Sequence, residues 1–208
     1  MKVYVIEEHG LESALLGLGL SFGKTSNMTL QDIHDNKDGV ASRMLAAARR
    51  LAGRGNGHDK FLRCITVSLD CQGSLAWWKQ ADTYKVGTTA QSESTMHTIT
   101  ARPFTADMFE LDEPDAPFVV AFLEVLNNLR QEYVTATDEG QKKRTWRKLI
   151  QYMPCSFLQR RIVSANYQVL RTIITQRAGH KLGEWQAFRA GILCGVRHPE
   201  LLVGENKA

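Results

Sequence analysis

The spacing of apolar residues changes between the two halves of the chain, and this change limits the folds that the sequence can adopt. Phe61 to Leu69, with the sequence FLRCITVSL, alternates apolar and polar residues and is rich in β-branched side chains, which predicts a strand. Lys2 to Ile6, KVYVI, predicts a short buried strand. The second half instead repeats apolar residues every three or four positions, as an α-helix requires. Few strands and many helices in mixed order predict an α+β domain with a helix-rich C-terminal half.

Four stripes of apolar residues predict amphipathic helices. Each stripe keeps its members on one helical face, and Pro154 ends the third because proline cannot continue a helix. The fourth belongs to a helix that is predicted to begin at Gln159. The stripes are Val40, Met44, Ala47 and Leu51; Phe118, Phe122, Val125 and Leu129; Trp146, Leu149, Ile150 and Met153; and Val163, Tyr167, Leu170 and Ile174. Further predictions are helices at residues 11–22 and about 182–193, a polar loop at 32–38, a glycine-rich break at 53–59, and a polar tail after the last helix.

The length and composition favour one folded domain that spans residues 1–208. The chain is 43% hydrophobic and 23% charged, which is typical of a globular protein and excludes a disordered or fibrous one. Its apolar runs are far shorter than the roughly 20 residues that a membrane span needs. Glu7 and Glu8 interrupt the N-terminal stretch where a signal peptide would be apolar. We therefore expect a cytoplasmic protein that makes no membrane contact.

Cysteine usage and charge narrow the chemistry. The four cysteines are widely spaced and form no CxxC pair, so neither a zinc site nor a disulfide scaffold is expected. The net charge of +4 suits an anionic ligand such as a nucleotide or a phosphate ester. A nucleic-acid binder usually concentrates its basic charge more strongly, so nucleic acid is not the first expectation. The basic cluster QKKRTWRK at residues 141–148 keeps open a second hypothesis, a helical protein that binds nucleic acid or an acidic partner.

Arg177 is the first candidate for a functional residue, because it continues the fourth apolar stripe at the same spacing of three and four. A guanidinium that points at a core cannot lose its charge and needs a carboxylate, a phosphate or another acceptor. The alternative is that Arg177 lies in the last helical turn, complements the helix dipole and reaches solvent. The spacing alone leaves both interpretations open.

The segment DTYKVGTTAQSESTMH, residues 82–97, is a candidate ligand loop. Its small and hydroxylic residues let backbone N–H groups approach a ligand closely, and the hydroxyls add further donors. Trp77 and Trp78 would anchor its start, while Lys85 supplies a positive charge and Glu93 an acid or base. The alternative is a surface loop whose side chains bond to its own backbone.

His58 follows the glycine-rich GRGNG and is a candidate cofactor contact. An isolated histidine is more often a surface or packed residue, so this alternative also stays open.

The late part of the chain resembles the flavin-dependent thymidylate synthases. That family carries Leu-Pro, then Asn-Ala-Arg-x-Leu, and a helix that reaches Leu-Arg. In this sequence Pro154 matches the proline, and NYQVLRTIITQR places Asn166, Leu170 and Arg177 in register with the Asn, the Leu and the final Arg. The family's later Ala-Gln-x-Glu-Ile is replaced by HKLGEW, residues 180–185.

The early family motif is only partly matched. The family carries Arg-His-Arg, two residues, Ser, one residue, Asn-Glu, one residue, Ser, one residue and Arg-Tyr. In YKVGTTAQSES, Ser94 matches the second Ser, Gln91 stands where the family has Asn, and Lys85 matches either the His or the last Arg of Arg-His-Arg. Arg-His-Arg itself is replaced by TYK or YKV, and the closing Arg-Tyr by Met96 and His97.

The resemblance implies a fold and a reaction. The fold would be α/β, with a central twisted sheet flanked by helices, assembled as a homotetramer with FAD at the subunit junctions. The reaction would transfer a one-carbon unit from methylenetetrahydrofolate to C5 of a pyrimidine deoxynucleotide monophosphate, as in dUMP to dTMP, with NADPH as the reductant of FAD. Alternatives are hydroxymethylation, methylation of another nucleotide such as dCMP, or a non-catalytic nucleotide- or nucleic-acid-binding relative that has lost flavin.

The resemblance also implies roles for particular residues, and no metal ligand is among them. The implied catalytic residues are Ser94 and Arg177; the cofactor-binding residues are Lys85, Gln91, Asn166 and His58; and the substrate-binding residues are Arg177, Ser94, Gln91, Glu93 and Arg161.

Overall fold

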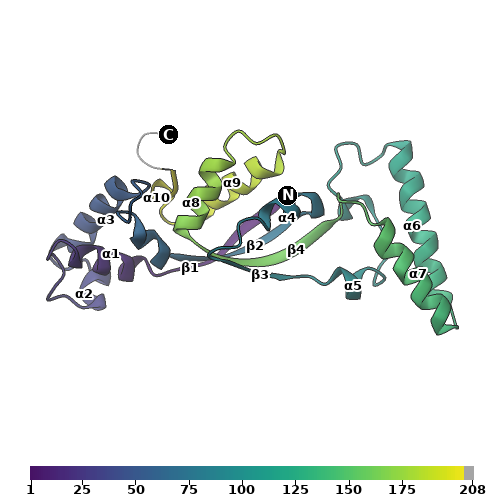
Figure 1. Ribbon diagram of the computed structural model, residues 1–208, viewed down its shortest axis with the longest axis horizontal. Helices are drawn as coiled ribbons and strands as arrows, with labels where there is room; N and C mark the ends of the chain where they lie inside the picture. The colour runs from purple at the N-terminus through teal and green to yellow at the C-terminus, as the bar shows by residue number, and fades with distance from the viewer. Residues whose placement is uncertain (204–208) are drawn as a thin grey trace. The chain divides into compact units, whose positions relative to one another are not determined.

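A four-stranded antiparallel sheet connects the elements of the computed structural model, which describes residues 1–203 (Figure 1). The strands are β1 (Lys2–His9), β2 (Thr66–Ser74), β3 (Thr88–Ser92) and β4 (Leu158–Asn166), in the order β1-β2-β4-β3. The backbone N–H of Tyr167 donates to the Ile65 carbonyl at one end of the β2–β4 pair, and the N–H of Leu75 donates to the Phe157 carbonyl at the other. Such pairing in reverse order defines antiparallel strands. The predicted α/β class, with a central sheet and flanking helices, is confirmed.

The chain divides into two compact units. One unit contains Met1, residues 72–82 and residues 91–161, and the other contains residues 2–71, residues 83–90 and the chain from residue 162 onward. Strands β2 and β4 each contribute residues to both units. The single domain that was predicted over residues 1–208 stays a prediction.

The unit that contains β1 is mainly helical. Its helices are α1 (Leu11–Leu20), α2 (Leu30–His34), η1 (Lys37–Gly39), α3 (Val40–Leu51), η2 (Lys60–Cys64), α8 (Tyr167–Gln176), α9 (Glu184–Gly195) and α10 (Glu200–Val203). Helices α1, α2 and α3 pack together, and α9 packs along β1 (Figure 1). Gly191 and Gly195 make this second contact possible, because a Cβ atom on either would lie within 3.0 Å of a valine of β1. The valine side chains of β1 thus pack directly against the backbone of α9.

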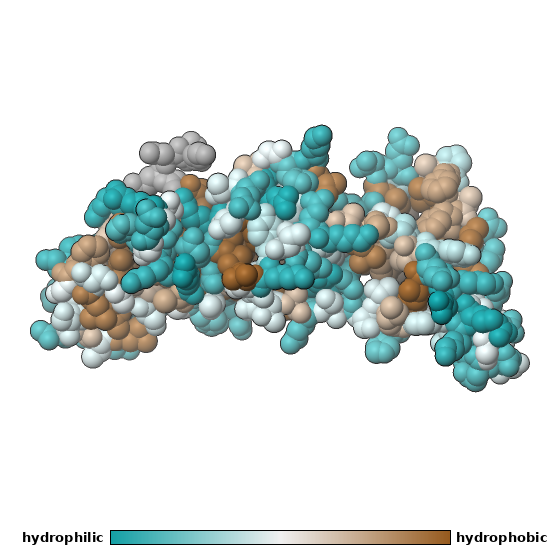
Figure 2. All heavy atoms as spheres, viewed as in Figure 1, coloured by the Kyte–Doolittle hydropathy of each residue, from teal (hydrophilic) through white to brown (hydrophobic). Residues whose placement is uncertain are grey.

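The unit that contains α4 (Leu75–Ala81) is built around a helical hairpin. Its other helices are α5 (Thr95–Thr98), η3 (Ala106–Met108), α6 (Pro117–Thr135) and α7 (Glu139–Tyr152). Helices α6 and α7 lie side by side, and the Asp138 side chain caps α7 by accepting from the Gln141 N–H. The core beneath the hairpin consists of Ile99, Phe104, Phe109, Leu126, Leu129, Leu149 and Phe157. Figure 2 shows hydrophilic residues over the joined ends of the two helices.

Three secondary-structure predictions are wrong at their boundaries. The strand predicted to begin at Phe61 begins at Thr66, because residues 60–64 form the 3₁₀ helix η2. The helix predicted to begin at Gln159 is strand β4 up to Asn166, and only from Tyr167 onward is it helix α8. Burial in β4 alternates from residue to residue, which is the period of a strand. The predicted polar loop at residues 32–38 contains the end of α2 and most of η1.

The apolar stripes are partly confirmed. Helix α3 buries Val40 and Met44 as predicted, with Ala48 in place of Ala47. Helix α6 buries Leu129 and packs Phe122 against the core as predicted, but it buries Val119 and Leu126 in place of their neighbours, since Phe118 is 79% exposed and Val125 is 52% exposed. In α7, Leu149 is buried and Trp146, Ile150 and Met153 pack against the core of the same unit, as the third stripe predicts. The predicted polar tail includes the short helix α10, and its last five residues lie outside the described residues.

No helix within residues 1–203 is long and apolar enough to cross a membrane.

Gly10 connects β1 to α1, and replacing it tests how tightly this connection is packed. Its φ is +90°, and a Cβ atom there would collide with the Cys64 carbonyl oxygen. We expect Gly10→Ala to destabilise the protein by about 3 kcal/mol, since left-handed backbone costs about 1–2 kcal/mol and overpacking adds about 1–3. Gly23→Ala is the matched control, because its φ is +63° but no atom of residues 1–203 lies within 4 Å of the added carbon. The control should lose only about 1 kcal/mol in urea unfolding. Equal losses would show that the collision is relieved at no cost.

Candidate functional site

Arg177 lies at the C-terminal end of α8, in a corner formed by two aromatic rings. Its Cζ atom is 4.7 Å from the centroid of the Trp185 ring and 5.3 Å from that of the Tyr84 ring. Its Nε atom is buried and has no hydrogen-bond partner among residues 1–203. The side chain forms no ion pair within the described chain. A buried charged donor without a partner costs free energy, so this atom marks a place where an acceptor from a ligand would be stabilising.

The segment that carries Tyr84 runs along α8. The Tyr84 hydroxyl donates to the Gln176 Oε1 atom at 3.0 Å, near the end of the helix. Gly87 lies at the other end, where an added Cβ atom would be 3.2 Å from the Asn166 Nδ2 atom and 2.9 Å from a Val169 methyl group. The φ of Gly87 is +80°, so glycine is required there both for the turn and for the close approach. The sequence YKVG is therefore built to lie against this helix.

Asn166 has a structural role at the start of α8. Its Oδ1 atom accepts a hydrogen bond from the Val169 N–H at 3.0 Å, which is the usual arrangement of an N-cap. The cofactor contact of Asn166 stays a prediction. Its side-chain Oδ1 atom already accepts a hydrogen bond from the first turn of α8.

Lys85 is exposed, and its ammonium group makes no hydrogen bond or ion pair with any residue from 1 to 203. It lies between Tyr84 and Gly87 in the same unit as Arg177. The group is therefore available to a ligand.

The other predicted residues of the segment belong to the unit that contains α4. Gln91 in β3, Glu93 and Ser94 are all exposed. Ser94 is the N-cap residue of α5, yet within the described chain its hydroxyl caps no N–H group. The backbone of Glu93 is held instead, because its N–H donates to the Arg160 carbonyl and its own carbonyl accepts from the Gln159 Nε2 atom. A fixed backbone with unused side-chain donors and acceptors suits ligand contact.

Arg161 is already occupied by its own protein. Its side chain is 14% exposed, its Cζ atom stacks 4.1 Å from the centroid of a Trp78 ring, and its Nη1 atom donates to the Asp82 Oδ1 atom at 2.8 Å. Its Nε atom donates to Gln159. These contacts tie β4 to the end of α4, so the protein itself already uses the Nε and Nη1 donors of the arginine that was predicted to bind substrate.

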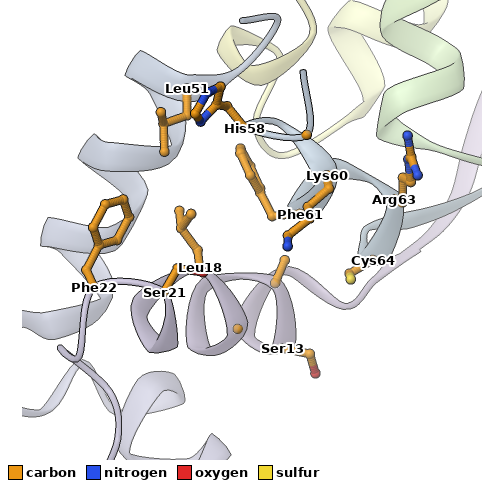
Figure 3. Close-up of a pocket in the computed structure, with 13 residues that line it drawn as sticks. Ser13, Leu18, Ser21, Phe22, Leu51, His58, Lys60, Phe61, Arg63 and Cys64 are labelled. Atoms are coloured by element: carbon orange, nitrogen blue, oxygen red, sulfur yellow. The ribbon is translucent and has the colours of Figure 1, made fainter. Parts of the chain in front are cut away.

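A cavity of about 540 Å³ lies between α1, the end of α3 and η2, and it was not predicted from the sequence. Figure 3 shows the side chains of Leu18, Phe22, Leu51 and Phe61 around one space, with His58 at its edge. The predicted cofactor residue His58 is therefore exposed at the rim of an apolar cavity. The glycine-rich break provides this edge, because Gly53, Gly55, Asn56 and Gly57 all have positive φ angles.

Charge at this rim comes from η2. Lys60 extends toward α1 in Figure 3, while Arg63 also lines the cavity but points away from its centre. An apolar cavity with a cationic edge fits a ligand that combines a flat apolar ring system with negative charge. The sequence signal that could have located it is the apolar face of residues 11–22 next to a glycine-rich break.

Other chemistries find no support in the described residues. No group of three or more His, Cys, Asp and Glu within residues 1–203 is placed to hold a metal ion. Burial, together with the charge of Asp70, raises the pKa of the Cys71 thiol to about 12, so it is a protonated core residue near neutral pH. In the basic cluster of α7, the Lys142 Nζ atom lies 3.7 Å from the Glu139 Oε1 atom. The Arg144 Nη2 atom lies 3.8 Å from the Asp138 Oδ2 atom. These acids partly neutralise the cluster, which is then an ordinary solvated helix face.

Sequence comparisons and structural comparisons give different results for this chain. No protein-family model and no curated protein matches it significantly. Among solved structures, the chain is similar to the flavin-dependent thymidylate synthase ThyX from Helicobacter pylori complexed with FAD and dUMP. The TM-score is 0.75 at 15% sequence identity, over 98% of each chain. A second structure of ThyX from Helicobacter pylori with FAD and dUMP gives a TM-score of 0.73 at 14% identity, over 99% of this chain and 98% of that one.

The chain therefore has the fold of the flavin-dependent thymidylate synthases over essentially its whole length. The resemblance expected from the sequence is confirmed at the level of the fold.

Proposed function

We propose that this protein is a flavin-dependent enzyme that transfers a one-carbon unit to C5 of a pyrimidine deoxynucleotide monophosphate, with dUMP to dTMP as the first choice. The observation that carries the proposal is the buried Nε atom of Arg177, which has no hydrogen-bond partner among residues 1–203, in a chain with this fold. In the solved structures of similar fold, the ligands are FAD and dUMP. A fold supports many activities, so the proposal depends on this site and is tested there.

The residues around Arg177 fit a nucleotide monophosphate. Guanidinium groups bind phosphate and carbonyl acceptors through charge-assisted hydrogen bonds, which are stronger than neutral ones. We assign Arg177 to the substrate, either at its phosphate or at a carbonyl oxygen of the base. In the second position it would draw electron density from the pyrimidine and so help to activate C5. In the other unit, the Ser94 hydroxyl and the Gln91 amide are exposed and stay proposed as substrate donors, and Glu93 stays a proposed acid or base.

The residues at the cavity fit FAD. Leu18, Phe22 and Phe61 supply apolar walls for a planar ring system, and His58 supplies a polar group at the rim. Lys85, whose ammonium has no partner among residues 1–203, is available to a phosphate group. A bound flavin would supply hydride chemistry, and for that reason no nucleophilic protein side chain is required. Methylenetetrahydrofolate as the one-carbon donor, NADPH as the reductant, a homotetramer and a cytoplasmic location complete the proposal.

The absorption spectrum of the purified protein tests this proposal first. We expect a flavin spectrum, either directly or after addition of FAD, with FAD identified by chromatography of the released cofactor. Isothermal titration should then show dUMP binding. With methylenetetrahydrofolate and NADPH added, mass spectrometry of the nucleotide should show dTMP.

The mass of the product distinguishes methylation from hydroxymethylation, because a hydroxymethyl group is heavier than a methyl group. A separate reaction with dCMP as the substrate tests whether another nucleotide is modified. Binding of dUMP without any flavin would replace the redox reaction by nucleotide binding alone. Failure to bind either FAD or dUMP would reject the proposal. Binding of nucleic acid that weakens steeply with salt would then support the second hypothesis, in which the basic cluster of α7 binds nucleic acid.

A further inference from the structure

We infer that Tyr84 and Trp185 are positioning residues that fix the direction of the Arg177 guanidinium before a nucleotide arrives. The inference rests on the proposed function, since it concerns the same arginine. It concerns residues that depart from the family motifs, because Tyr84 stands in the replacement for Arg-His-Arg and Trp185 in the replacement for Ala-Gln-x-Glu-Ile.

The two rings form adjoining walls. Their centroids are 6.2 Å apart and their planes are inclined at 73°, with the Arg177 Cζ atom near both. A cation over an aromatic face is attracted by the negative face of the ring, and this attraction grows when water is excluded. Two walls at a steep angle restrict the guanidinium more than one stacked ring would. They also explain why the Nε atom is buried with no acceptor from the described residues.

Each wall is itself anchored. Tyr84 is held by the hydrogen bond from its hydroxyl to Gln176, and by the Thr88 hydroxyl, which donates to the Tyr84 carbonyl. Trp185 is fully buried and meets the ring of Phe188 edge-on at 5.8 Å. The His180 ring lies against Trp185 at 6.1 Å. The walls therefore determine where the arginine lies.

The backbone of Arg177 is fixed as well. The last carbonyl groups of a helix lack partners within the helix and need others. The Gln186 Nε2 atom donates to the carbonyls of Arg177 at 3.2 Å and Ala178 at 3.1 Å. The Arg189 Nε atom donates to the Ile174 carbonyl at 3.0 Å, and its Nη1 atom donates to the Gln186 Oε1 atom. These two side chains of α9 hold the end of α8, so both the backbone and the side chain of Arg177 are ordered by folding.

A pre-ordered arginine strengthens ligand binding. An arginine on a free surface has several rotatable bonds that binding must immobilise, which weakens the affinity. In this protein that ordering has already occurred in the free state, at the cost of a buried donor that has no acceptor among residues 1–203. The two aromatic rings thus hold the N–H groups of Arg177 in fixed directions. A ligand binds well only if its acceptor atoms lie in those directions.

Two substitutions of Tyr84 test the inference in the full-length protein. Tyr84→Leu removes the wall, and Tyr84→Phe keeps the ring but removes the hydrogen bond to Gln176. We expect Tyr84→Leu to weaken dUMP binding by about five- to tenfold in isothermal titration, because it removes a cation–ring contact. Tyr84→Phe should stay within about twofold of the parent. Tyr84→Met is a second ringless variant, to be used if the leucine variant lowers the melting temperature.

The NMR signal of the Arg177 Nε–H group gives a readout that does not depend on the proposed function. Ring currents from two aromatic walls should displace this signal in the parent and in Tyr84→Phe, and Tyr84→Leu should move it toward the position of a free arginine. The inference is overturned if Tyr84→Leu leaves this signal in place, or if it binds dUMP like the parent while Arg177→Ala does not. Parent-like dUMP binding by Arg177→Ala would instead reject the nucleotide site, and with it the proposed function.

Discussion

Replacing Arg177 with alanine is expected to abolish dUMP binding and to leave the fold largely intact. The loss should be about 3–4 kcal/mol, or about two to three orders of magnitude in Kd, because a charge-assisted contact to the substrate disappears. The fold should persist, since the Arg177 side chain forms neither a hydrogen bond nor an ion pair with any residue from 1 to 203. Isothermal titration measures the affinity, and thermal denaturation followed by circular dichroism measures the stability.

Arg50→Ala is the matched control for this experiment. It removes the same charge from an exposed position on α3 in the same unit, so it should change neither the affinity for dUMP nor the melting temperature appreciably. If Arg177→Ala bound dUMP as tightly as the parent, the assignment of the nucleotide site would be wrong.

Replacing Gly17 with phenylalanine is expected to abolish FAD binding by filling the cavity. Gly17 lies on α1 among the lining residues, and no atom of residues 1–203 lies within 4 Å of a Cβ atom built there. The added ring therefore enters open space, next to Phe22 and Phe61, without displacing the helix. We expect a colourless protein whose melting temperature is close to that of the parent, and fluorescence titration with FAD measures the loss.

Gly17→Ala is the control for the cavity experiment. It occupies little of the cavity and should raise the stability by about 0.5–1 kcal/mol, because glycine is a poor helix former. It should bind FAD like the parent. A phenylalanine variant that still took up FAD at the parent's affinity would show that the flavin binds somewhere other than this cavity.

The elements that the sequence predicted well are those that local periodicity determines. Helices α3 and α7 each have a clear apolar face; α3 was located closely, and the end of α7 was located by Pro154, although its start at Glu139 was not predicted. Strand β4 was mistaken for a helix because Ile162 and Val163 are adjacent, so its alternation is hidden, and because a real helix follows it immediately. In α6, Leu129 is buried as predicted, but Val119 and Leu126 are buried in place of their neighbours Phe118 and Val125, which are equally apolar. Local sequence does not choose between two such faces.

The candidate site was predicted in part for the same reason. Arg177 could be singled out because Leu170 and Ile174 precede it at helical spacing within α8. Its neighbours Tyr84 and Trp185 could not, because Tyr84 lies far away in the sequence and Trp185 belongs to the next helix, α9, so no local pattern joins them to Arg177. The cavity was missed because it is the space left between three elements, and the apolar face of residues 11–22 beside the glycine-rich break is only an indirect sign of such a space. His58 was found only through the glycines before it.

The run of the Tyr84 segment along α8 also affects how the protein folds. The hydrogen bond between Tyr84 and Gln176 joins residues that are 92 positions apart. Contacts of such long range form late, because a large loop must close before any of them is made. We therefore expect the surroundings of Arg177 to assemble after α8 and much of the sheet have formed. A nucleotide bound at Arg177 would contact a site that exists only after these distant segments have come together. It would therefore stabilise the native state at the last contacts to form.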